Sequence, residues 1–307
     1  MKATLSNQIH LSCLTTAQSE VIQQALTFRN PKHVEAQQQG PTYGIPRILE
    51  LFEIVPGGLV IPRGVSLPSG VTEIDDQRNS YPVVIGSTIQ PRAYQERCIK
   101  RAIHQGSGVI VAPTGSGKTT MGIEIAARLG QRCLILVKSL DLAKQWQDAI
   151  KRFTGFDAGL IGGGKWQEGE QFTIGLVQTL VKQDSGLDYG LVIVDECHNI
   201  PAAQAYEVIN RQAAKYRYGL SATPQRRDNM EFMIHAVLGG IVAEVEAHEV
   251  GGAVLPVTIS TIQHNFIGNP ESWTDFINLL ALDDERNRVI VASAIKSSQA
   301  GHAGRQC

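Results

Sequence analysis

Residues 109–120 read Val-Ile-Val-Ala-Pro-Thr-Gly-Ser-Gly-Lys-Thr-Thr, a pattern whose residue types suit the binding of a phosphate chain. The β-branched residues at its start predict a buried strand, and a helical pattern follows the small-residue turn at 121–129. Successive backbone N–H groups in such a turn and at a helix N-terminus bind anions. We expect Lys118 to reach the β- and γ-phosphates of ATP and the Thr119 hydroxyl to hold Mg²⁺. The predicted ATP-binding residues of this loop are Pro113, Thr114, Gly115, Ser116, Gly117, Lys118, Thr119 and Thr120.

Two acidic residues and a histidine follow the apolar run Leu191–Val194. Open α/β sheets place their ligands at the carboxyl ends of their strands, which is where Asp195, Glu196 and His198 would lie. We expect Asp195 to orient Mg²⁺ through a water beside Thr119, and Glu196 to polarise the water that attacks ATP. His198 would link the site to neighbouring motifs. The alternative is an ordinary surface turn, and the position downstream of a phosphate loop in one α/β unit argues against it.

Two further polar segments belong to the same unit. Ser221 and Thr223 follow a strand-like run, and their hydroxyls are placed to bond the turn after Asp195 and to couple its state to the rest of the site. Taken alone, this segment would be a helix cap or a turn. Upstream, Gln95 precedes the first helix of the unit and offers a donor and an acceptor on one planar group, which suits the Hoogsteen edge of adenine.

Composition limits the class of protein. The 307 residues are enough for about two domains, and 43% apolar with 19% charged residues is ordinary for a globular protein. The formal net charge of −1 gives no sign of bulk attraction to nucleic acid, although a local groove stays possible. The five cysteines form no CxxC pair, which fits reduced thiols in the cytosol. Since no apolar run could cross a bilayer and no secretory signal begins the sequence, we expect a cytoplasmic protein without a membrane partner.

The elements that must position these residues alternate between apolar runs and amphipathic helices. Continuous apolar strands separated by such helices predict a parallel sheet covered on both faces. The fold class is therefore α/β. We expect helices at 141–153 and 202–214. The expected strands are Val109–Ala112, Cys133–Val137, Thr173–Val177, Leu191–Val194 and Tyr218–Leu220.

Two less regular segments flank this unit. Residues 1–88 predict a small α+β module that ends in a linker, and 248–307 predict a connector followed by a short helical extension. The parallel-sheet unit between them spans 89–247. Within the flanks we expect a capped helix at Ser12–Leu26, strands at 48–55 and 58–61, a linker at 66–88, an extended connector at 251–262, and helices at Trp273–Leu282 and Arg286–Ser297.

The order of the motifs resembles that of a known family. The segment with Arg92 and Gln95 resembles the adenine-reading Q element, residues 112–119 resemble motif I, Asp195–His198 resemble motif II and Ser221–Thr223 resemble motif III. The chain thus resembles superfamily-two helicases and translocases of the DExH-box kind, in particular repair helicases of the xeroderma-pigmentosum group B type and related phage and bacterial helicases. This resemblance implies a RecA-like fold for the sheet, ATP and Mg²⁺ as ligands, and adenine binding by Arg92 and Gln95.

Motif Ia and the motif after it carry the DNA-strand contacts of this family. Residues 134–139 with Gln145 and Trp146 match the first, and residues 177–180 match the second. Amides and hydroxyls can bind the phosphates of DNA without reading its base sequence, and such contacts are compatible with a net charge near zero. The N-terminal module resembles the small damage-recognition-like module of the same group, so single-stranded, branched or distorted DNA is the expected partner. The resemblance assigns the strand contacts to Lys138, Ser139, Gln178 and Thr179.

Members of this family have a second RecA-like domain, whose arginine finger is worth about 10³–10⁵ in rate in comparable NTPases. Residues 284–290 resemble its entry helix, and the resemblance does not assign Arg226 or Arg227 as the finger. We therefore expect the N-terminal half of an ATP-dependent DNA helicase or translocase, with weak hydrolysis unless another polypeptide supplies the second domain. The alternative is a non-motor nucleotide- and DNA-binding module, either a regulatory fragment or a subunit completed in trans. A small-molecule kinase does not account for motifs Ia and III.

Overall fold

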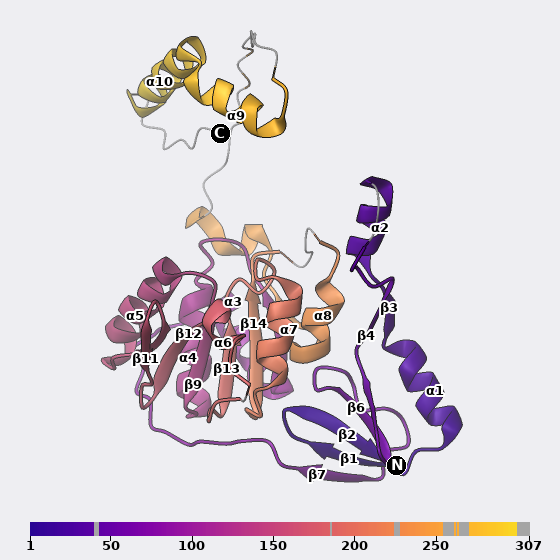
Figure 1. The fold of residues 1–307 in the computed structure, drawn as a ribbon. Helices are drawn as coiled ribbons and strands as arrows, with labels where there is room; N and C mark the ends of the chain where they lie inside the picture. Colours follow the sequence, from indigo (N-terminus) through magenta and orange to yellow (C-terminus); the bar gives the residue numbers. More distant parts are fainter. Residues whose placement is uncertain are drawn as a thin grey trace. The chain divides into compact units, whose positions relative to one another are not determined.

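The computed structural model gives the chain two compact units, Met1–Leu255 and Pro256–Cys307, which are described separately. The first unit holds an eight-stranded sheet, a five-stranded sheet and a two-stranded ribbon (Figure 1). In the second, α9 (Trp273–Leu282) and α10 (Asp284–Gln299) lie within two residues of the expected helices. No helix among the described residues is both long and apolar enough to span a membrane. The structure describes residues 1–39, 43–184, 186–223, 228–253, 261, 263 and 270–299.

The eight-stranded sheet is parallel except at one edge, where β11 runs against β10. Its order is β11-β10-β12-β9-β13-β14-β8-β15, so neighbouring strands come from distant parts of the sequence. Strands that are apolar along their whole length need cover on both faces, and helices supply it (Figure 1). The predicted α/β class with a parallel sheet is confirmed. The strands are β8 (Ser107–Val111), β9 (Cys133–Val137), β10 (Gly159–Gly162), β11 (Lys165–Gln167), β12 (Phe172–Leu176), β13 (Leu191–Val194), β14 (Tyr216–Ser221) and β15 (Ile241–Glu244).

Side chains of each strand alternate between two apolar cores, one on each face of the sheet. In β9, Cys133, Ile135 and Val137 belong to the core that includes α3, α4 and α5. Leu134 and Leu136 belong to the core that includes α6, α7 and α8. The helices are α3 (Ala93–Gln105), α4 (Lys118–Leu129), α5 (Leu140–Thr154), α6 (Val177–Leu180), α7 (Ala202–Asn210) and α8 (Glu231–Leu238).

The expected strands of this sheet lie within two residues of the observed ones, whereas one helix differs. The helix expected at 202–214 ends at Asn210, because the backbone at Ala214 pairs with Asn79 instead of continuing the helix. Strands β10, β11 and β15 and helix α8 have no counterpart in the predicted pattern. The connector expected at 251–262 lies mostly outside the described residues, and its first residues belong to the 3₁₀ helix Ala247–Ala253.

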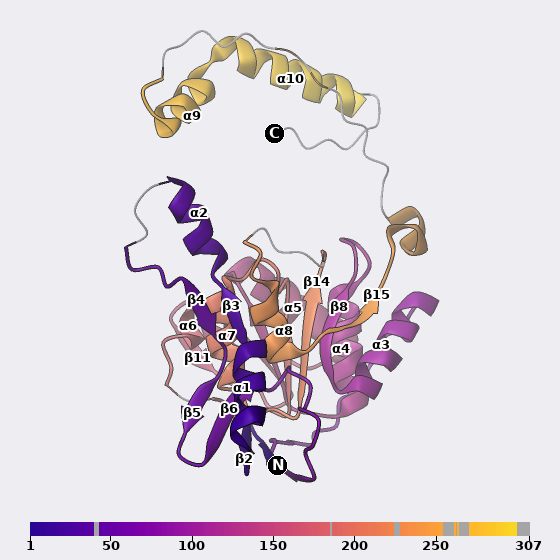
Figure 2. The ribbon, with the colours of Figure 1, turned by 90° about the vertical axis from the view of Figure 1, so that its right-hand side faces the viewer.

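The N-terminal part forms a sheet of order β5-β6-β2-β1-β7 and the β3–β4 ribbon. The helix expected at 12–26 is α1 (Thr16–Ala25), capped by Thr15, whose hydroxyl accepts from Gln18 N while the Gln18 side chain accepts from Thr15 N. In Figures 1 and 2, α2 lies at the end of the ribbon away from the five-stranded sheet. The remaining elements are β1 (Lys2–Leu5), β2 (Gln8–Ser12), β3 (Thr27–Arg29), α2 (Pro31–Gln39), β4 (Ile48–Glu50), β5 (Glu53–Val55), β6 (Gly58–Pro62) and β7 (Glu73–Asp76).

Two expectations for this part need correction. The strand expected at 48–55 is two strands, because the chain changes partner at Leu51, which is buried and donates its N–H to Leu26 O. The expected linker, 66–88, contains β7, which pairs parallel to β1 and forms one edge of the five-stranded sheet.

The N-terminal part packs tightly against α7 and α8 of the parallel-sheet part. Its core includes Met230 and Met233, and the rings of Phe28 and Phe232 stack with centroids 4.3 Å apart. Gly64 N donates to Ala236 O at 2.7 Å. Deleting residues 1–88 would therefore expose apolar side chains of α8. The domain boundaries predicted after residues 88 and 247 stay predictions.

An ion-pair cluster joins α3 to α4 on the outside of the sheet, and it gives a first testable prediction. Arg128 donates to both carboxylate oxygens of Glu96, at 3.0 and 2.7 Å, and to Glu124 at 2.8 Å. The Arg128 hydrogen bond lowers the pKa of Glu96 from 4.5 to about 2. Because the pair is partly exposed, we expect Glu96→Gln to lower the free energy of unfolding by only about 0.5–1 kcal/mol.

The sign of the pH dependence follows from the lowered pKa. The folded state holds the Glu96 carboxylate more strongly than the unfolded state, so the contribution is complete above about pH 4.5 and is lost as the pH falls towards 2. Urea unfolding of the Glu96→Gln variant against the parent at pH 7 and pH 3 checks this. Glu170→Gln, an exposed carboxylate, is the control. A stability difference that grows as the pH falls would contradict the prediction.

Candidate functional site at the carboxyl edge of the parallel sheet

The residues expected to do chemistry lie where neighbouring parallel strands end. The phosphate loop follows β8, Asp195 follows β13, and Ser221 ends β14. In the sheet these strands stand in the order β13-β14-β8, so their carboxyl ends share one edge. Sequence positions about a hundred residues apart are thus neighbours, as expected for a ligand site of an open α/β sheet.

The phosphate loop is shaped by glycines in left-handed backbone. Gly115 has φ +84° and Gly117 has φ +81°, values that side chains with a Cβ rarely adopt. A Cβ on Gly117 would lie 2.5 Å from Gln95 Nε2, so a side chain there would also displace the end of Gln95. Ser116 is buried, and its hydroxyl has no hydrogen-bond partner among the described residues. These features leave backbone N–H groups and a hydroxyl available to a phosphate chain.

Lys118 is the first residue of α4 and is 8% exposed. Its Nζ donates to Ala112 O at 3.1 Å and lies 3.3 Å from Glu196 Oε1. The ammonium therefore sits between the phosphate loop and the acidic turn after β13. This position puts the positive charge of Lys118 where the phosphates of ATP are predicted to bind.

The two carboxylates after β13 have different surroundings. Asp195 is 5% exposed, and its Oδ2 accepts a hydrogen bond from the indole Nε1 of Trp146 at 2.8 Å. Burial raises the pKa of Asp195, and the Trp146 hydrogen bond opposes that rise. Glu196 has φ +47°, which is uncommon outside glycine and accompanies the close approach of its side chain to Lys118.

A chain of polar contacts links the acidic turn to the end of β14. Glu196 Oε2 lies 3.3 Å from His198 Nδ1, and His198 Nδ1 lies 2.9 Å from Ser221 Oγ. Ser221 Oγ in turn accepts from Thr223 N at 3.3 Å and donates to Thr223 O. The structure thus brings together four of the six residues that the sequence grouped for catalysis and coupling. Their chemical roles stay predictions.

The segment predicted to bind adenine also supports the phosphate loop. Gln95 is 7% exposed; its Oε1 accepts from Arg92 N at 2.8 Å and its Nε2 donates to Ser116 O at 2.8 Å. Tyr94 donates to the same Ser116 carbonyl at 3.0 Å. This segment was expected to precede the first helix, whereas α3 begins at Ala93 and contains both Tyr94 and Gln95, so the contact of Tyr94 with the loop was not predicted. Adenine binding by Arg92 and Gln95 stays a prediction.

The predicted DNA contacts follow β9 and β12, which are adjacent in the sheet with Val137 opposite Leu176. The side chains after these strands therefore share the same edge as the phosphate loop. Arg226 and Arg227 lie outside the described residues. Of the predicted contacts, Lys138 and Gln178 are exposed, Thr179 is half-buried, and Ser139 caps α5 by accepting from Leu142 N at 3.4 Å.

The donor set fits Mg²⁺ and ATP. A buried unpartnered hydroxyl, a glycine cradle, an ammonium and two carboxylates face the same edge, and hydroxyl and carboxylate oxygens are the ligands that Mg²⁺ prefers. Thr119 and Asp195 would hold the metal, which would neutralise phosphate charge when bound. The sequence placed Trp146 in motif Ia but did not predict its contact with Asp195; the signal for that contact is an indole N–H that requires an acceptor when it is buried.

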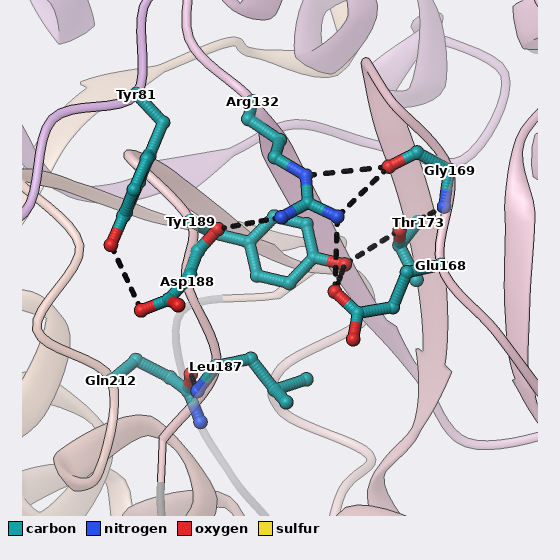
Figure 3. A network of polar contacts seen from close by, with 9 residues as sticks. All are labelled: Tyr81, Arg132, Glu168, Gly169, Thr173, Leu187, Asp188, Tyr189 and Gln212. Carbon is teal, nitrogen blue, oxygen red and sulfur yellow. Dashed lines mark hydrogen bonds and ion pairs between the residues drawn. The ribbon is translucent and has the colours of Figure 1, made fainter.

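A second polar network lies at the amino ends of the strands, and Figure 3 shows its residues. The Arg132 guanidinium lies over the Tyr189 ring, 4.6 Å from its centroid, and donates to Gly169 O and to Glu168 Oε2. The Tyr189 hydroxyl donates to Glu168 Oε2 at 3.0 Å and lies 2.7 Å from Thr173 Oγ1. These residues lie before or at the starts of β9, β12 and β13, so the network fixes the amino ends of these strands. The candidate functional site lies at the carboxyl ends.

Comparison with known proteins agrees with this geometry. Residues 88–226 match the family model described as "Type III restriction enzyme, res subunit". The DNA 3'-5' translocase XPB2 of Sulfurisphaera tokodaii is 33% identical over 178 residues, which cover 55% of this chain and 39% of that protein. The probable helicase D10 of Escherichia phage T5 is 29% identical over 133 residues, covering 43% of this chain and 30% of that protein. The matches therefore span well under half the length of these curated relatives.

A solved structure extends the likeness to the N-terminal part. The UvsW helicase of bacteriophage T4 superposes with a TM-score of 0.58 at 18% identity, covering 79% of this chain and 100% of that chain. At this identity the likeness shows the fold alone, and it is the RecA-like fold that the sequence predicted. Residues 88–226 thus match the restriction-enzyme res-subunit family, and the chain is similar to DNA 3'-5' helicases of the XPB type and to a phage helicase.

Proposed function

We propose that this chain binds Mg²⁺·ATP at the phosphate loop and DNA along the neighbouring part of the same edge, as part of an ATP-driven DNA helicase or translocase. The observation that carries the proposal is the 3.3 Å approach of Lys118 Nζ to Glu196 Oε1, continued by His198 to Ser221. A phosphate-binding ammonium beside a candidate base, with a polar connection to the next motif, suits hydrolysis that is coupled to motion. The printed names of the relatives, a DNA translocase and a helicase, support the DNA part.

In this proposal each side chain has one role. Lys118 binds the β- and γ-phosphates, Thr119 and Asp195 bind Mg²⁺, and Glu196 polarises the attacking water. The contact between His198 and Ser221 reports the state of the acidic turn to β14. Lys138, Ser139, Gln178 and Thr179 hold one DNA strand through its phosphates.

We further propose that the 307-residue polypeptide by itself hydrolyses ATP slowly. In the described part of the chain, Lys118 and His198 are the groups that form ion pairs with Glu196, and no arginine does so. A finger from a second RecA-like domain, in the same or another polypeptide, would supply the missing charge. Phosphate release with and without DNA tests this. Robust DNA-stimulated turnover by the chain alone would contradict slow hydrolysis, and absence of both ATP and DNA binding would contradict the proposed function.

Lys118→Ala is expected to weaken ATP binding by about ten- to a hundredfold, because a charge-assisted hydrogen bond contributes about 1.5–3 kcal/mol. Titration calorimetry with a slowly hydrolysed ATP analogue and Mg²⁺ measures the loss. Lys100→Ala removes a largely exposed ammonium from α3 and serves as the matched control, with expected binding equal to the parent. Unchanged affinity in the Lys118 variant would argue against the phosphate loop as the binding site.

A further inference from the structure

Trp146 makes a polar contact that its place in the core does not require. It lies on α5, is 1% exposed, and is surrounded by the apolar core of α3, α4 and α5. A phenylalanine or leucine would suit the burial of apolar surface there. The indole N–H instead finds its acceptor in Asp195 Oδ2 at 2.8 Å, across 49 residues of sequence. A buried indole N–H without an acceptor is costly, so this bond fixes both partners.

The other end of the indole touches the helix that begins in the phosphate loop. A Cβ built on Gly122 of α4 would lie 2.8 Å from Trp146 Cη2 and 3.3 Å from Leu220 Cδ1. Gly122 is therefore the position on α4 at which the ring can approach the helix backbone. Thr119, the predicted Mg²⁺ ligand, lies one helical turn earlier on the same face. The ring thus spans the distance between the helix of one metal ligand and the carboxylate of the other.

The contact also orients the Asp195 carboxylate. Its Oδ2 accepts the indole N–H at 2.8 Å, which limits rotation of the carboxylate about its own axis. Outer-shell hydrogen bonds of this kind orient metal ligands and raise metal affinity.

We propose that Trp146 is a positioning residue for Mg²⁺ binding: its N–H orients and holds Asp195 while its ring braces α4 below Thr119. The inference rests on the proposed function, in which Asp195 and Thr119 hold the metal. It adds a residue of α5, the helix whose first turn follows the predicted DNA contacts Lys138 and Ser139.

The test is the Mg²⁺ dependence of nucleotide binding by the full chain. Trp146→Phe keeps most of the ring and removes the N–H, so we expect the Mg²⁺ concentration for half-maximal tightening of ADP binding to rise about tenfold or more. Binding of ADP in EDTA should stay within about twofold of the parent, because the phosphate loop is intact.

A double variant separates positioning from packing. In an Asp195→Asn background the Trp146→Phe change should no longer alter the Mg²⁺ dependence; an equal shift in both backgrounds, or no shift in either, would overturn the inference. A parent chain whose nucleotide binding ignores Mg²⁺ would overturn the proposed function itself. Mg²⁺-dependent binding in the parent, with an unshifted Trp146→Phe variant, would overturn only the role of Trp146.

A measurement on the intact side chain covers the case in which Trp146→Phe fails to fold. The indole ¹H–¹⁵N signal of Trp146 can be assigned by elimination with Trp166→Phe and Trp273→Phe, which change exposed rings. We expect the signal to move when Mg²⁺ is added to the ADP complex and to move again in Asp195→Asn. A signal indifferent to both would overturn the inference.

Discussion

Glu196→Gln is expected to reduce ATP hydrolysis by about a hundredfold or more while leaving nucleotide affinity within about threefold of the parent. The amide keeps the size of the side chain and its place beside Lys118 Nζ, 3.3 Å away, so the phosphate site persists. It loses the negative charge that would polarise the attacking water. General-base groups contribute about 10²–10⁴ in rate, which sets the size of the effect.

The measurement is single-turnover hydrolysis with protein in excess over radiolabelled ATP, because slow turnover by the parent would hide the difference in a steady-state assay. Affinity is measured in parallel by calorimetry with a slowly hydrolysed analogue. Glu170→Gln, at an exposed position, should hydrolyse ATP as the parent does. A Glu196→Gln variant as fast as the parent, beside an inactive Asp195→Asn, would place the base elsewhere.

The parts of the site that could be predicted are those whose geometry is local. A strand, a glycine turn and a helix in one continuous stretch determine the phosphate loop, and apolar strands that end in polar residues place Asp195 and Ser221 at one edge of a parallel sheet. The left-handed φ of Gly117 follows from the same stretch.

Contacts between distant segments could not be predicted. Nothing in a single sequence shows that Trp146 on α5 turns its N–H to Asp195, or that the Gln95 side chain donates to Ser116 O. Strand β7 escaped prediction for a related reason: all its side chains are exposed, and its pairing partner β1 begins at residue 2. Its only signal is the hydrogen bonding of its backbone, which sequence periodicity does not record.

Arg217 is the strongest case of a residue whose place the sequence conceals. It lies in β14 and is fully buried, although arginine is among the residues least often buried without a partner. Its guanidinium donates to Asn7 O at 2.7 Å, to Val237 O at 3.2 Å and to Gln212 O. One side chain thus joins the turn between β1 and β2 to α8 and to the segment before β14.

We expect Arg217→Met to lower the free energy of unfolding by about 2–4 kcal/mol. Two buried carbonyls, of Val237 and Gln212, and the partly buried carbonyl of Asn7 lose their donor. An unsatisfied buried acceptor costs about 1–3 kcal/mol. Relief from burying a guanidinium offsets part of this loss, since burial and the nearby charges of Arg63 and Arg78 already lower the pKa of Arg217. The loss of the hydrogen bonds outweighs this relief, because the three carbonyls belong to separate segments that methionine cannot join.

Urea unfolding of Arg217→Met against the parent measures the loss, with Arg101→Met on the exposed face of α3 as the control at about zero change. An Arg217→Met variant as stable as the parent would mean that the cost of burying the charge cancels its hydrogen bonds. Hydrogen exchange locates the effect: the turn between β1 and β2 should lose protection before the phosphate loop does. Arg217 and Ser221 stand on the same face of β14, four residues apart, so loosening that spreads along this strand reaches the contact with His198 before it reaches Lys118.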